Sequence, residues 1–98
     1  MNLNLSEKLK TGLTPQEKID CYEYCLNTID KFEFICIGII EYFGGDHLKN
    51  HEPIFNTLFP ELIKLKPSKV DFGKGWFNST EERIQVLNKL IEEQKKLL

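Results

Sequence analysis

Apolar positions in the first third of the chain recur at the spacing of an α-helix. Thr14 precedes a proline, and Glu17 follows three residues after Thr14, which is the pattern of a capping box with proline at the first helical position. The apolar residues that follow lie three and four positions apart, on one face of a helix: Ile19, Tyr22, Leu26 and Ile29. The pattern predicts a helix over residues 15–29.

The helical spacing continues over residues 32–43 until Gly44 and Gly45 end it. Asp30, with a glutamate three residues later, is a second cap-like pattern, so two interpretations remain open. Residues 15–43 form either one long helix or a tight antiparallel hairpin of helices 15–29 and 32–43. The usual length of helices favours the hairpin. A buried strand at 34–37 is a lesser alternative, because the run contains β-branched residues.

Segment 32–43 is apolar on nearly every side, so it must be buried on nearly every side. It is therefore either the central helix or part of an interface between copies of the chain. A small domain with such a helix often completes its core by oligomerising, and we predict a homo-oligomer.

Prolines and glycines divide the rest of the chain. Ser6 is expected to cap a short turn that Gly12 ends, and Pro53 and Pro60 are expected to open two short helical pieces. Residues 67–78 have no period and form a loop. The last helix is predicted over 80–96, capped by Ser79 and Glu82, with an apolar stripe of Ile84, Leu87, Leu90 and Ile91.

These elements predict an all-α fold in one domain, residues 1–98: a compact bundle of about four helices with a long lysine/aromatic loop before the C-terminal helix. Apolar residues make up 41% and charged residues 29%, which is typical of a soluble globular protein. The uncharged run 34–40 is far too short to cross a membrane, and no secretory signal is visible. A net charge of −2 argues against binding to duplex nucleic acid. The three cysteines indicate reduced thiols in a cytoplasm.

Segment 64–77 carries the best candidate binding site. Four of the twelve lysines lie there among three aromatic residues, and glycines flank Lys74. Lysines beside aromatic faces suit a phosphate joined to a base. The candidate ligand-binding residues are Lys66, Lys69, Phe72, Lys74, Trp76 and Phe77. The alternative is that Trp76 and Phe77 complete the core while the lysines are solvated. Neither a Walker loop nor the parts of a kinase are present.

Two cysteines and two histidines form a weaker candidate site. Cys21 and Cys25 are four residues apart, as are His47 and His51, which gives four ligands of the kind that holds zinc. The gap between the pairs is not that of a zinc finger. The alternative is two cysteines in the core and two histidines beside a turn, because free cysteine is among the most buried residue types.

Catalysis has little support in the sequence. A Cys–His pair is the only available combination of nucleophile and base, and Cys36 lies in the most apolar run, where burial makes a thiol inert. The acids of the first helices are expected to form a solvated face. We expect no enzyme and no cofactor.

The chain resembles small helical proteins of about this length from phages and gut bacteria. The resemblance covers residues 30–92 and rests on the order Phe34-Ile35-Cys36, Phe59-Pro60-Glu61, Lys66-Pro67, Trp76-Phe77 and Glu82-Arg83-Ile84 with Leu87, Leu90 and Ile91. It implies an accessory protein that blocks host defence. Some phage proteins of this class are oligomeric sponges that trap nucleotide signals, and others mask a host protein. The resemblance therefore implies either a nucleotide-like ligand held by the lysine–aromatic loop or a host-protein partner. A zinc-stabilised structural domain is the third alternative.

Overall fold

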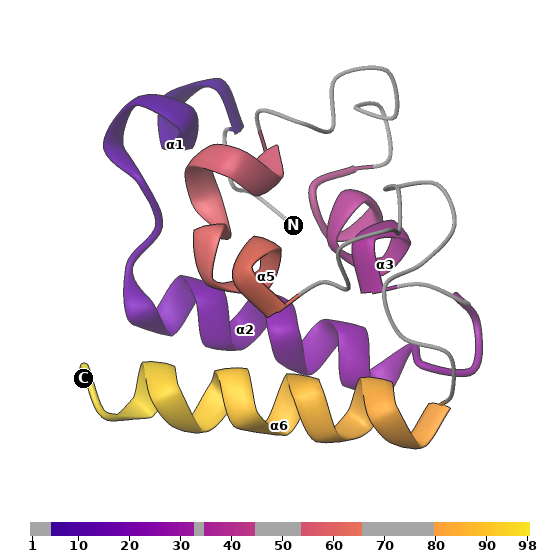
Figure 1. Ribbon diagram of the computed structural model, residues 1–98. Coiled ribbons are helices and arrows are strands. Elements are labelled where there is room, and N and C mark those ends of the chain that lie inside the picture. Colours follow the sequence, from indigo (N-terminus) through magenta and orange to yellow (C-terminus); the bar gives the residue numbers. More distant parts are fainter. Residues whose placement is uncertain (1–4, 33–34, 45–53, 66–79) are drawn as a thin grey trace.

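The computed structural model describes residues 5–32, 35–44, 54–65 and 80–98, and every regular element in those ranges is helical (Figure 1). The all-α fold class is thereby confirmed. The elements are α1 (Leu5–Thr11), α2 (Pro15–Asn27), α3 (Ile35–Tyr42), the π-helical turn η2 (Ile54–Leu58), α5 (Pro60–Leu65) and α6 (Thr80–Lys95).

The capping box predicted for α2 is present. The Glu17 N–H donates to Thr14 Oγ1 at 3.2 Å, and the Thr14 N–H donates to Glu17 Oε1 at 2.9 Å. The helix ends at Asn27, two residues earlier than expected, and a turn follows. Ile29 thus lies in the turn, where its N–H donates to the Leu26 carbonyl at 3.3 Å.

Segment 15–43 contains two separate helices, as the hairpin interpretation predicted, and the single long helix is wrong. The strand alternative is also wrong, since α3 begins at Ile35. α3 ends at Tyr42, and Gly44 follows with φ +102°, a conformation that glycine adopts without strain. In Figure 1, α3 stands at a steep angle to α2, so the two helices do not form the tight antiparallel pair that we expected.

Gly12 ends α1 as predicted. Its φ is +82°, and its N–H donates to the Lys8 carbonyl at 2.7 Å. The prediction for Ser6 was wrong: α1 already begins at Leu5, so Ser6 is inside the helix rather than at its cap.

The short middle helices follow their prolines. Pro60 is the first residue of α5, as predicted. Proline fits this position because the N–H that it lacks would have no partner within the first turn of the helix. The preceding piece is a π-helix, η2, rather than an α-helix. The predicted role of Pro53 and the predicted loop over 67–78 lie outside the described residues.

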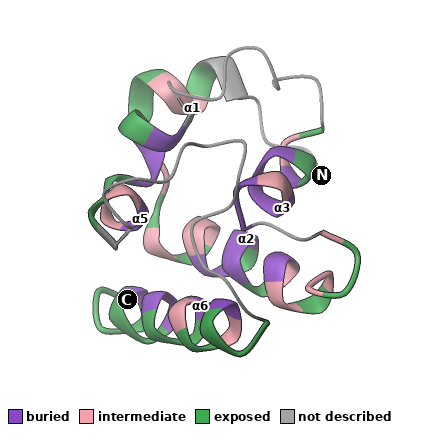
Figure 2. Ribbon diagram, turned by 45° about the vertical axis from the view of Figure 1, so that its right-hand side comes forward, coloured by how far each residue is buried: buried purple, intermediate pink, exposed green. Residues whose placement is uncertain are grey.

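The helices form two layers. α2 and α6 lie side by side and run in opposite directions, while α3 and α5 cover the other side of α2, and α1 lies beside η2 (Figure 1). α6 matches its predicted range to within one residue, and its outer face is exposed (Figure 2). The side chains buried between the layers form one cluster, to which α2, α3, η2, α5 and α6 all contribute.

α3 is buried within a single chain. Six of its residues are buried, namely Ile35, Cys36, Gly38, Ile39, Ile40 and Tyr42. Of the two alternatives given for this segment, the central helix is the one observed. We predicted a homo-oligomer because this apolar helix would otherwise be exposed. Its burial within one chain removes that reason, and the homo-oligomer stays a prediction.

Candidate functional site

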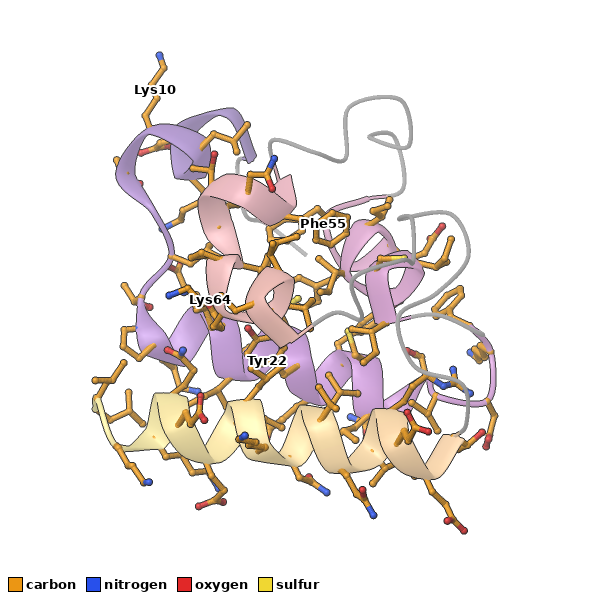
Figure 3. The ribbon with its side chains drawn as sticks, viewed as in Figure 1. Lys10, Tyr22, Phe55 and Lys64 are labelled. Carbon is orange, nitrogen blue, oxygen red and sulfur yellow. The ribbon has the colours of Figure 1, made fainter. Side chains whose placement is uncertain are left out.

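The candidate ligand-binding residues Lys66, Lys69, Phe72, Lys74, Trp76 and Phe77 lie outside the described residues. The helices on either side of them are described. α5 ends at Leu65 with Lys64 exposed (labelled in Figure 3), and α6 begins at Thr80. The buried side chains of Leu62 and Leu87 fix these two helices in the core. The lysine–aromatic segment therefore starts and ends on elements that are held in place.

Arg83, the one arginine of the chain, connects the first turn of α6 to the end of α2. One guanidinium nitrogen donates to the Phe32 carbonyl at 2.7 Å, and another donates to Thr80 Oγ1 at 3.0 Å. The residue is only 9% exposed. The Phe32 carbonyl lies just after the turn that follows α2. Arg83 thus fixes the turn between α2 and α3 against α6.

A small pocket lies beside Arg83, between α2, α3 and α6. Its lining residues are Cys25, Thr28, Ile29, Phe32, Ile35, Gly38, Arg83 and Leu87. The interior has room for about one water molecule. A nucleotide cannot enter it.

The first turn of α6 also carries Glu81 and Glu82. Carboxylates at this point would repel a phosphate if they faced it. Both residues are exposed, and neither lines the pocket beside Arg83.

A second polar group joins α2 to α5. The Tyr22 hydroxyl donates to Glu61 Oε1 at 2.6 Å, and Lys18 Nζ lies 3.1 Å from the same oxygen. Tyr22 is fully buried under α5 (Figure 3). Desolvation, reinforced by the charge of Glu61, raises the pKa of Tyr22 well above its ordinary value. The phenol therefore stays protonated and acts as a hydrogen-bond donor.

The cysteines lie in the core, as the alternative to the zinc site predicted. Cys21, Cys25 and Cys36 are all buried, and none of them forms a disulfide. Desolvation, followed by the contact with Cys25, raises the pKa of Cys21. His47 and His51 lie outside the described residues, and no cluster of three metal-binding side chains occurs within the described ranges.

The acids of α2 form an exposed face. Asp20, Glu23 and Asp30 are exposed, whereas Glu17 is half-buried and lies 2.7 Å from Lys8 Nζ. Burial raises the pKa of Cys36 to about 11, as expected for an inert thiol. In the described part of the chain, neither these groups nor Tyr22 faces a cavity that would admit a substrate.

The role of Arg83 was not predicted from the sequence. The predicted stripe of α6 included Ile84, which is only half-buried, while Arg83 and Gln94 are buried. The sequence did contain a signal, because Arg83 lies four residues before Leu87 and Gln94 lies three residues after Ile91. Both residues therefore fall on the apolar stripe of the helix. Polar residues on an otherwise apolar stripe mark positions where a polar group enters the core.

No helix in the described ranges combines the length and the apolar character that a membrane span requires. Comparison of the chain with protein-family models, with curated proteins and with solved structures found no match.

Proposed function

We propose that the chain is a small, non-enzymatic binding protein that sequesters an anionic, nucleotide-like ligand through the lysine–aromatic segment, residues 64–77. Lys66, Lys69 and Lys74 would bind the phosphate, and Phe72 or Trp76 would stack on the base. Phe77 borders this group. The single observation that carries the proposal is the concentration of four lysines and three aromatic residues in this one segment.

The described residues support this proposal by their arrangement. The buried side chains already form a cluster between the helices, and the pocket within it is too small for a nucleotide. The helices on either side of the segment, α5 and α6, are both anchored in the core by buried leucines. Binding at the segment therefore does not have to order these two helices, which lowers its entropic cost.

The single tryptophan provides the direct test. We expect the fluorescence of Trp76 to change saturably when a nucleoside monophosphate or ADP-ribose is added. Lys74→Ala should abolish the response, whereas Lys89→Ala, which removes a charge from the exposed face of α6, should leave it intact. Native mass spectrometry of gently purified protein would show a retained nucleotide and the number of subunits. A flat fluorescence titration together with a bare monomer would contradict the proposal.

A protein partner is the second candidate, and the exposed acids of α2 favour it. Asp20, Glu23 and Asp30 present negative charge on the outer side of the α2–turn region. The apolar helix α3 offers a partner little surface, because most of Ile35–Tyr42 is buried. A pull-down that recovers one stoichiometric host protein, and loses it with Asp20→Lys and Glu23→Lys, would favour this function.

A further inference from the structure

Arg83 carries a positive charge into the interior without an acidic partner among the described residues. Its two hydrogen-bond acceptors, the Phe32 carbonyl and the Thr80 hydroxyl, are both neutral. The ion pairs within the described ranges all use lysines: Lys8–Glu17, Lys18–Glu61 and Lys95–Glu92. A buried charge is costly unless an opposite charge compensates it, and the described residues place no carboxylate on the Arg83 guanidinium.

Among the residues that the structure describes, the guanidinium also has N–H donors without an acceptor. Arginine offers five N–H groups in a planar fork, and the two bonds described above use two of them. The side chain lines the small pocket together with Thr28 and Phe32. The space beside it fits one atom of the size of a water oxygen. One oxygen of an anion can therefore enter while the rest of the group stays at the mouth.

We propose that Arg83 binds a phosphate-type oxyanion at the mouth of the pocket between α2, α3 and α6. A guanidinium N–H makes a strong, charge-assisted hydrogen bond to a phosphate oxygen, and the N-terminus of α6 adds partial positive charge. The choice of phosphate rests on the function proposed above, because the lysine–aromatic segment leads directly into α6. The phosphate is either free or part of the nucleotide-like ligand.

The single arginine allows a test without mutation. In protein labelled with ¹⁵N, the Nε–Hε resonance of Arg83 is the one arginine signal of this kind. We expect inorganic phosphate, added at constant ionic strength, to shift this resonance saturably, while chloride does not. A nucleoside monophosphate that shifts it at lower concentration identifies the phosphate as part of a nucleotide. A shift that inorganic phosphate produces and a nucleoside monophosphate does not identifies the ligand as a free phosphate ion. A response that is the same for phosphate and chloride, or no response, overturns the proposal.

Substitutions give a second readout. Arg83→Gln should weaken phosphate binding, measured by calorimetry, at least tenfold. Lys89→Gln removes the same charge from the exposed face of α6 and should leave binding unchanged. If the Arg83→Gln variant does not fold, the NMR titration of the unmodified protein with phosphate still tests the proposal.

The two proposals fail separately. A Trp76 response to nucleotide without any change at Arg83 would support the binding segment and reject the arginine site. A shift of the Arg83 signal by inorganic phosphate without a Trp76 response would do the opposite.

Discussion

Gly38 lies where α3 comes closest to α2. A Cβ atom at this position would lie 3.2 Å from Cys25 Sγ and 3.7 Å from Cys25 Cβ. The φ of Gly38 is not positive, so the need for glycine comes from this close approach and not from backbone conformation. The smallest side chain thus sets the distance between two helices.

We expect Gly38→Ala to destabilise the fold by about 1 kcal/mol in urea unfolding, because overpacking at Cys25 outweighs the better helix propensity of alanine. In a Cys25→Ala background the sulfur is absent. There the same substitution should be neutral or stabilise by up to about 0.5 kcal/mol. Equal effects in the two backgrounds would show that the sulfur contact does not determine the cost.

Tyr22 is the second residue with a specific role, which it fills through its hydroxyl group. Tyr22→Phe removes its 2.6 Å bond to Glu61 and should cost about 1–2 kcal/mol, since a hydrogen bond to a charged group is worth more than a neutral one. The control is Tyr24→Phe, whose ring is half-buried and packs on Tyr42 with a centroid distance of 5.4 Å. It should change the free energy of unfolding by less than about 0.5 kcal/mol. Similar losses for both variants would contradict a special role for the bond to Glu61.

Among the helices, the start of α2 is the element that sequence predicted most completely. Threonine, proline and glutamate at fixed spacing satisfy specific backbone groups, so the local sequence alone determines where the helix begins. The same holds for Gly12, Gly44 and Pro60. The end of α2 was predicted less well, because Ile29 continued the apolar period although the chain had already turned.

The capping box also makes the stability of α2 depend on pH. The bonds from Lys8 and from the Thr14 N–H lower the pKa of Glu17 below its ordinary value of 4.5. A lowered pKa in the folded state means that the carboxylate stabilises the fold above the ordinary pKa. That contribution is lost as the pH falls through the lowered pKa.

The difference in unfolding free energy between the unmodified protein and Glu17→Gln should therefore shrink from about pH 6 to about pH 2. Glu23→Gln, an exposed change on the same helix, serves as the control and should show little pH dependence. A difference that stays constant over this range would contradict the role of the Glu17 charge.

At the scale of the whole molecule, the buried thiols report on the opening of the core. Cys21, Cys25 and Cys36 lie between α2 and α3, and burial raises the pKa of Cys36 to about 11. At about pH 8 we expect a disulfide reagent such as Ellman's reagent to modify the folded protein slowly. All three thiols should react at once in denaturant. Rapid modification of one thiol in the native protein would show that the core opens locally.

Fold class was predictable because proline, glycine and helical periodicity act over a few residues. The angle between α2 and α3 was not, since it depends on contacts such as Gly38 on Cys25 that no local pattern encodes. The binding segment was identified by composition alone, whereas the Arg83 pocket required three helices to meet. Burial of α3 inside one chain likewise followed from tertiary packing and removed the original reason for predicting an oligomer.

The antiparallel pairing of α2 with α6 has a consequence for biosynthesis. α6 follows α2 only after the whole stretch from Thr28 to residue 79 has been made. Until Leu87 and Leu90 have left the ribosome, the side of α2 that packs against α6 stays uncovered. The entropic cost of closing this long loop must also be met before the contacts between α2 and α6 can form. The nascent chain therefore exposes this side of α2 to chaperones and proteases until α6 has emerged from the ribosome.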